Sequence, residues 1–256
     1  MGEKSTYRYF TELGFTGTNY HGWQIQPNSA SVQQTLEKAA SAVLRQEINF
    51  TGCGRTDTGV HARNYTAHFD TTFSPDQLHE MDLVYKLNRI IPDDISIHSI
   101  TRVKPDAHAR FSALNRSYEY YICRKKDPFM VNRAWLVERD LDFESMQQAS
   151  QLLFKFNDFE AFTKANTQVN HFRCHIMEAG WTIEDHLWIF HIKADRFLRN
   201  MVRAIVGTIT DVGLGKIDLK QMEEIIKSKN RSNAGYSVPG SGLYFMGAEY
   251  PREIYL

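Results

Sequence analysis

The sequence predicts an α+β protein built from two ferredoxin-like halves, each with the order β-α-β-β-α-β. Two observations predict this fold: segments of strand and helix character follow one another in the same order twice, and 256 residues suffice for two domains of average size. In such a fold, each antiparallel sheet carries its helices on one face and leaves the other face open.

The first half begins with a strand over 7–15, where aromatic or apolar residues occupy the odd positions. Ser31 opens an S-x-x-Q capping box, and apolar residues at helical spacing follow it. Ser74 and Pro75 predict the start of a second helix, because proline suits the first helical position, and its apolar stripe continues to Pro92. The remaining strands of this half are predicted over 48–53, 65–73 and 95–103.

The second half begins with a strand over 117–124, and Asp142 then caps a helix. The remaining strands are predicted over 176–183, 187–193 and 243–249, and the remaining helices over 197–212 and 218–229. We place the boundary where a strand ends in a proline turn, which gives domains of residues 1–104 and 105–256.

Composition limits the classes of protein that the chain can belong to. Hydrophobic residues make up 42% and charged residues 23%, which is typical of a soluble globular protein, and no apolar run is long enough to span a membrane. The start, MGEKSTYRYF, lacks the apolar stretch of a signal peptide, so a cytoplasmic location is expected.

Neither the cysteines nor the histidines indicate a metal site. Cys53, Cys123 and Cys174 are odd in number and far apart, which predicts reduced, packed thiols. The ten histidines show no metal-ligand spacing. We therefore expect no metal site.

The run Gly54-Arg55-Thr56-Asp57-Thr58-Gly59 predicts a catalytic carboxylate. Glycines give a turn the backbone freedom that a close approach to a ligand needs, and side chains two residues apart share one face of an extended stretch. Arg55 and Asp57 are therefore expected to point together. The alternative is an Asx-turn with a surface ion pair.

An open sheet face suits RNA, because it can present aromatic and basic side chains to unstacked bases. Tyr118 lies on the first strand of the second half, where its ring could stack on an extruded base; the alternative is a tyrosine of the sheet core. Arg196, Arg199 and Arg203 follow at helical spacing, which predicts a basic stripe on one helix face, the alternative being a solvated face.

The net charge is zero, so only the arrangement of the charges bears on a polyanionic partner. Besides that stripe, basic residues gather at Lys104, Arg110 and Arg116, and at 124–126. These groups are compatible with a basic groove, although a mixed solvated surface would also contain them.

Seven segments, in order along nearly the whole chain, resemble the tRNA pseudouridine synthase A family. They are GTNYHGWQIQ at 17–26, SVQQTLEKA at 31–39, GRTDTGVHA at 54–62, HARFSALNRSYEYYI at 108–122, NDFEAFTK at 157–164, FLRNMVRAIVGTI at 197–209 and SGLYF at 241–245. The resemblance implies isomerisation of uridine to pseudouridine at positions 38 to 40 of the tRNA anticodon stem-loop, without cofactor or metal. It also implies a homodimer and an RNA-binding cleft between the halves.

The resemblance also implies roles for individual residues. Asp57 matches the catalytic aspartate and Arg203 its ion-pair partner, while Arg55 matches an arginine that helps to displace the target base. Tyr118 matches the tyrosine stacked on the flipped uracil, and Leu243 matches an apolar wall of the pocket. With the basic groups above, Arg110 and Arg199 complete the expected substrate-binding residues.

Two residues depart from the family pattern, Thr58 in place of alanine and Ala107 in place of phenylalanine, and neither removes a catalytic group. Two other functions are compatible with parts of the chain. One is a non-catalytic RNA-binding protein, against which the acid in the motif argues. The other is an aspartate-dependent hydrolase or phosphotransferase, for which the sequence lacks a P-loop and an acidic cluster suited to magnesium.

Overall fold

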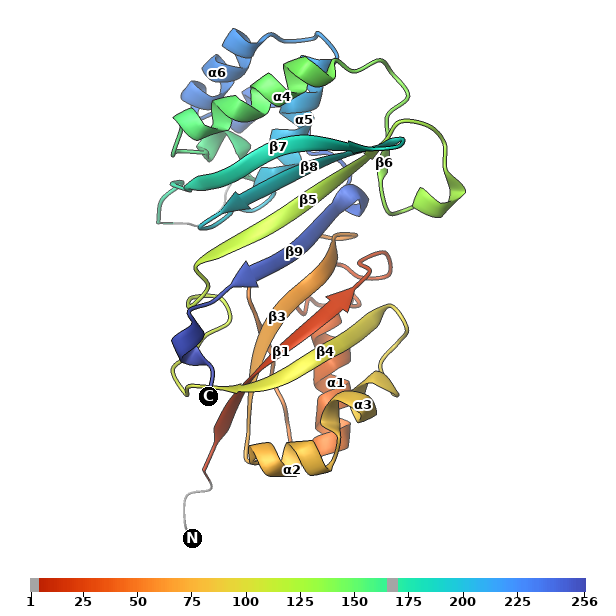
Figure 1. Ribbon diagram of the computed structural model, residues 1–256, viewed down its shortest axis with the longest axis vertical. Helices are drawn as coiled ribbons and strands as arrows, with labels where there is room; N and C mark the ends of the chain where they lie inside the picture. Colours follow the sequence, from red (N-terminus) through yellow and green to blue (C-terminus); the bar gives the residue numbers. More distant parts are fainter. Residues whose placement is uncertain (1–4, 165–169) are drawn as a thin grey trace. The chain divides into compact units, whose positions relative to one another are not determined.

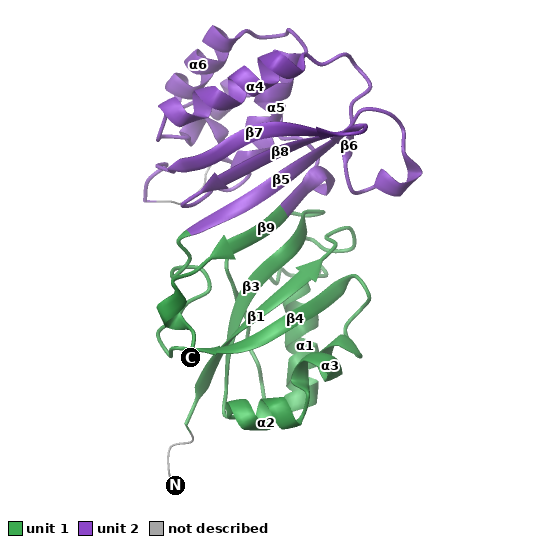
Figure 2. Cartoon of the chain, viewed as in Figure 1, with its two compact units in different colours: residues 1–114, 245–256 green, residues 115–244 purple. Residues whose placement is uncertain are grey.

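A computed structural model of the chain describes residues 5–164 and 170–256, which form two compact units (Figure 1). Unit 1 spans 1–114 and 245–256, and unit 2 spans 115–244 (Figure 2). Both units combine antiparallel strands with helices, which confirms a mixed α+β fold. None of the helices in the described parts of the chain is long and apolar enough to cross a membrane.

The strands of unit 1 follow one another in the order β4-β1-β3-β9, and the first two residues of β9 belong to unit 2. These strands are β1 (Tyr7–Phe15), β3 (His61–Thr71), β4 (Ile95–Val103) and β9 (Leu243–Glu249). β1 pairs antiparallel with both β3 and β4. The predicted bounds of β1, β4 and β9 are confirmed, whereas β3 begins at His61 rather than at residue 65.

The predicted strand over 48–53 is wrong except for β2 (Thr51–Gly52), which pairs with β3. Side chains of α1 (Val32–Leu44) explain the difference. The Ile48 amide donates to Ser41 Oγ at 3.0 Å, and the Phe50 amide donates to Glu37 Oε1 at 2.9 Å. Because side chains of α1 accept hydrogen bonds from both amides, these amides need no partner on a neighbouring strand.

The predicted second helix of the first half is two helices, α2 (Pro75–Glu80) and α3 (Leu83–Asn88). Its start is confirmed, because Ser74 and Gln77 form a capping box ahead of Pro75. The break lies at Asp82, whose φ of 48° is left-handed and whose side chain caps α3. A residue in this conformation interrupts a right-handed helix.

Within unit 2, β8 pairs antiparallel with both β5 and β7, and β6 pairs parallel with β5. These strands are β5 (Asn115–Cys123), β6 (Trp135–Leu136), β7 (Ile176–Glu184) and β8 (Leu187–Ala194). Helices α4 (Phe143–Leu152), α5 (Met201–Gly213) and α6 (Leu219–Ser228) pack on one another, with α4 against β7 (Figure 1). Asp142 and Asp218 cap α4 and α6, as predicted.

The predicted basic stripe on one helix face is wrong, because α5 begins at Met201 and not at residue 197. Asn200 has a left-handed φ of 68°, which ends any helical continuation toward the N-terminus. Arg196 and Arg199 therefore lie on the preceding loop, and only Arg203 lies on the helix.

The three cysteines are buried and free, which confirms packed thiols. Among them, Cys174 has a pKa raised to about 12 by burial. A thiol in that state is inert as a nucleophile at neutral pH.

Candidate active site

Asp57 lies in unit 1, on the loop that joins β2 to β3. The loop alternates in exposure: Arg55 is exposed, Thr56 is buried and Asp57 is half-buried. Residues 55–57 form neither helix nor strand, so contacts with other segments must fix them. Three of the contacts that the described residues make with this loop are informative.

The first contact is made by Tyr65 on β3. Its hydroxyl donates a hydrogen bond to the carbonyl oxygen of Gly54 and lies 3.4 Å from the Gly54 amide nitrogen. The ring is fully buried and stacks on Trp23 with 4.3 Å between ring centroids. A β-carbon at Gly52 would lie 2.1 Å from this hydroxyl, so the residue there must be glycine.

The second contact joins the middle of the loop to residues 22–23. The Trp23 amide donates to Thr56 Oγ1 at 2.9 Å, in a buried position. Gly22 has a φ of +92°, and a β-carbon there would lie 2.1 Å from the carbonyl oxygen of Thr56. Only glycine permits this close approach of the two backbones.

The third contact holds the end of the loop. The Gly59 amide donates to the carbonyl oxygen of Tyr20 at 3.3 Å, and the Gly17 amide donates to His61 Nδ1 at 3.1 Å. The Tyr20 hydroxyl in turn donates to Asp94 Oδ1 at 2.7 Å, and burial raises the pKa of this hydroxyl. The loop is thus attached to segment 17–23 along its length, which presents Asp57 on a preorganised backbone.

Tyr118 and Arg203 lie in unit 2. Tyr118 is half-buried on β5, and its ring meets Phe197 edge to face at a centroid distance of 5.0 Å. Arg203 lies in the first turn of α5, where its Nε donates to the Val238 carbonyl oxygen at 2.7 Å. This bond orients the guanidinium of a half-buried arginine.

The other three expected residues lie in different settings. Leu243 is buried at the start of β9, in unit 2. Arg199 is exposed on the loop before α5, and Arg110 is exposed in unit 1, with its guanidinium 5.4 Å from the centroid of the Phe111 ring. The expected residues thus fall into two groups, Arg55, Asp57 and Arg110 in unit 1 and the remainder in unit 2.

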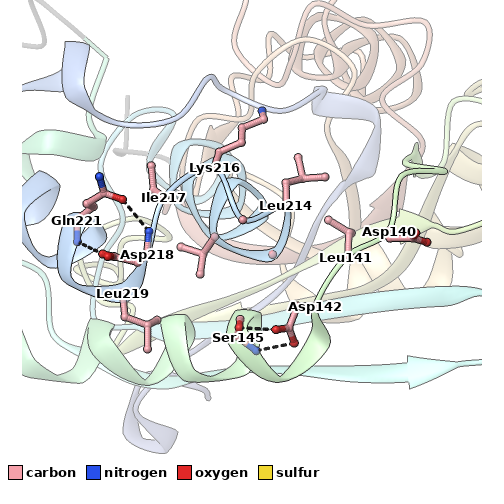
Figure 3. Close-up of a pocket in the computed structure, with 13 residues that line it drawn as sticks. Asp140, Leu141, Asp142, Ser145, Leu214, Lys216, Ile217, Asp218, Leu219 and Gln221 are labelled. Atoms are coloured by element: carbon pink, nitrogen blue, oxygen red, sulfur yellow. Dashed lines mark hydrogen bonds between the residues drawn. The ribbon is translucent and has the colours of Figure 1, made fainter.

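A hollow of about 820 Å³ lies in unit 2, among the ends of α4, α5 and α6, and its lining includes none of these residues (Figure 3). Asp142 and Asp218 lie on its wall, but both side chains cap helices. Within the described residues, no three histidine, cysteine or acidic side chains are grouped to hold a metal ion.

Comparisons with known proteins decide the family. A family model described as tRNA pseudouridine synthase matches residues 149–251. The tRNA pseudouridine synthase A of Bacteroides fragilis is 49% identical over 98% of this chain and 99% of its own length. The Bacteroides thetaiotaomicron protein of that name is 48% identical over 97% and 92%, and the Acetivibrio thermocellus one 38% over 93% and 97%.

The chain belongs to the tRNA pseudouridine synthase A family. The resemblance deduced from the seven motifs is thereby confirmed. So are the enzyme class, an isomerase, and the reaction, conversion of uridine in tRNA to pseudouridine.

Within this family member, sequence reasoning assigned no role to the residues that hold the Asp57 loop. Sequence patterns indicate no role for Tyr65 or Thr56, and they include Gly22 and Trp23 only within a longer segment that matches the family. One signal was present, a segment with glycines at 17 and 22 and aromatics at 20 and 23 ahead of the acidic turn. Glycines so close to aromatics indicate backbone packed against another segment.

Proposed function

We propose that the protein isomerises uridine to pseudouridine at positions 38 to 40 of the tRNA anticodon stem-loop, with Asp57 as its catalytic carboxylate. The observation that carries this proposal is the attachment of the Asp57 loop to segment 17–23 and Tyr65. A loop fixed in this way holds one half-buried carboxylate in a defined position. Family membership supplies the reaction that such a carboxylate would perform.

The reaction needs one carboxylate and no net change in composition. The bond from C1′ to N1 breaks, the uracil turns, a bond from C1′ to C5 forms, and the C5 proton moves to N1. Asp57 either attacks C1′ or abstracts the 2′ proton to give a glycal. Both routes require the ionised carboxylate, which an adjacent cation would favour.

We assign the other roles by family resemblance, and the local settings support them. Arg203 would pair with Asp57, and its bond to Val238 holds the guanidinium in one orientation. Tyr118 would stack on the flipped uracil, and Leu243 would wall the pocket, which would keep the detached base from escaping. Arg55 would help to displace the base.

Arg110 and Arg199 would contact the RNA backbone, and their exposure in the two units is compatible with that role. We further propose a cytoplasmic homodimer with an RNA-binding cleft between two ferredoxin-like halves, residues 1–104 and 105–256. Two subunits together could concentrate basic residues in one groove, although each chain has a net charge of zero.

The site on the tRNA is tested with transcripts that retain uridine at only one of positions 38, 39 and 40. Pseudouridine is mapped after incubation with the native protein. Product at these positions, and not at uridines elsewhere in the same transcripts, is expected. Product confined to another arm of the tRNA would overturn the assignment to the anticodon stem-loop.

A further inference from the structure

The segment 124–133 in unit 2 presents a basic and aromatic surface that none of the roles above uses. It contains four basic residues and one acidic residue. Phe129 is 81% exposed and Val131 is 64% exposed, and Lys125, Lys126 and Arg133 are also exposed. Large apolar side chains so fully exposed beside cations indicate a binding surface.

The backbone of this segment is nevertheless fixed. Asp127 Oδ1 accepts from the Phe129 amide at 2.8 Å and starts the short 3₁₀ helix η1 (Pro128–Met130). The other oxygen, Asp127 Oδ2, lies 2.9 Å from His186 Nε2, on the turn between β7 and β8. These two bonds raise the order of the loop without using its exposed side chains.

The two ends of the segment are also attached. Arg124 donates to the carbonyl oxygens of Val137 and Arg139, and its guanidinium lies 4.8 Å from the centroid of the Trp188 ring. At the other end, the Tyr244 hydroxyl donates to the carbonyl oxygen of Arg133 at 2.9 Å. Phe129 is thus displayed on a rigid support, which reduces the entropic cost of binding a partner.

The charges favour RNA as the partner. Within the segment, the exposed Lys125, Lys126 and Arg133 outnumber its one acid, Asp127, which is bonded to His186. The exposed acid Asp185 lies beside them on the turn between β7 and β8. Lys125 meets Asp185 only at 3.7 Å and with both side chains mostly exposed, so phosphate can compete for it. An exposed aromatic among cations is the arrangement that binds single-stranded bases and their phosphates.

We infer that segment 124–133 is an additional tRNA-contacting surface, on which Phe129 stacks against an unpaired base while Lys125 and Lys126 contact phosphates. This inference rests on the proposed function, since it takes tRNA as the substrate. It concerns residues outside the set assigned to the isomerisation.

Two variants test it, Phe129→Ala and the pair Lys125→Gln with Lys126→Gln. Matched controls in unit 2 are Phe154→Ala, a phenylalanine 45% exposed, and Lys220→Gln, an exposed lysine on α6. The dissociation constant for an unmodified tRNA transcript is measured by fluorescence anisotropy at several salt concentrations. Sedimentation velocity of the RNA-free proteins reports their oligomeric state.

We expect Phe129→Ala to raise the dissociation constant about fivefold or more, as removal of one base-stacking ring does. The lysine pair should reduce the slope of log affinity against log salt concentration by about one for each phosphate that is no longer neutralised. Both controls should bind tRNA like the native protein. Native affinity and slope in both loop variants would overturn the inference. So would altered sedimentation of the RNA-free variants, which would indicate a protein-binding surface instead.

The two variants change different exposed side chains. If one of them does not fold, the other still tests the inference by itself. Pseudouridine formation by the native protein on the same transcript reports the proposed function independently. If the native protein forms pseudouridine but both loop variants bind tRNA normally, only the inference on this segment fails.

Discussion

At the scale of single residues, the Tyr65 hydroxyl contacts the Asp57 loop from β3, through its hydrogen bond to the Gly54 carbonyl oxygen. The Tyr65 ring is fully buried, so water does not compete for the hydrogen bond from its hydroxyl to Gly54. Sequence patterns indicate Asp57 as a candidate catalytic residue because the motif around it is local. They do not identify Tyr65, because its partner is chosen only when β3 folds against the loop.

We predict that Tyr65→Phe lowers kcat about tenfold with little change in KM, because the ring and its stack on Trp23 remain while the loop loses one anchor. The matched control is Tyr9→Phe in the same unit, where a buried tyrosine also donates to a carbonyl oxygen, that of Phe73 at 2.9 Å. Each variant should lose about 1 kcal/mol of unfolding free energy. Equal kcat losses in the two variants would show that the Tyr65 effect is only a loss of stability.

We also predict acid sensitivity from His68 in unit 1. Burial lowers its pKa to about 4, and its Nδ1 accepts the Ala109 amide at 3.1 Å, which requires an unprotonated nitrogen. The unfolded chain takes up this proton near the usual pKa of about 6.5. Unprotonated His68 therefore contributes fully to the free energy of unfolding above pH 6.5. This contribution is lost as the pH falls toward 4, by at most about 1.4 kcal/mol per pH unit.

Urea unfolding of the native protein and of His68→Gln at pH 7.5 and pH 5.5 measures this contribution. The native protein should lose more unfolding free energy between the two pH values than the variant does. An identical loss in both proteins would mean that His68 does not titrate differently on unfolding.

At the scale of elements, sequence patterns succeed where the signal lies within the element itself. β1 and β4 have their predicted bounds, and α6 lies between its predicted end residues, Asp218 and Lys229, which are its caps, because alternation and capping residues are local. Bounds fail where another part of the chain competes. Side chains of α1 accept hydrogen bonds from the Ile48 and Phe50 amides, which precede β2. Asn200 is left-handed, so α5 begins only at Met201.

Gly22 tests how closely segment 17–23 and the Asp57 loop must approach. We predict that Gly22→Ala lowers kcat more than tenfold, because its β-carbon would lie 2.1 Å from the Thr56 carbonyl oxygen and displace the loop. The matched control is Gly215→Ala, at a φ of +67° with no atom within 4 Å of the added carbon. It shares the backbone strain of about 1 kcal/mol without the clash.

Steady-state kinetics and urea unfolding of both glycine variants separate the two effects. Gly215→Ala should lose stability and keep its kcat. Gly215 lines the hollow in unit 2, whereas Asp57 lies in unit 1, far from Gly215 in the sequence. A native kcat in Gly22→Ala would show that the loop tolerates displacement.

At the scale of the whole molecule, each unit fixes its own share of the expected residues through contacts within that unit. Unit 1 fixes the Asp57 loop, and unit 2 orients Arg203 through Val238 and Tyr118 beside Phe197. The family motifs are continuous stretches of sequence, so they predict the reaction and its candidate residues. The supports of those residues depend on tertiary contacts, which motif spacing does not encode.

Asp57 is the residue on which the proposed reaction depends, and one measurement tests it most directly. Native protein and Asp57→Ala are incubated with unmodified tRNA, without added cofactor or divalent metal, and pseudouridine in the anticodon arm is mapped. We predict product at positions 38 to 40 with the native protein and none with Asp57→Ala, although the variant still binds tRNA. Product from Asp57→Ala, or tRNA binding by both proteins without product from either, would contradict the assigned role.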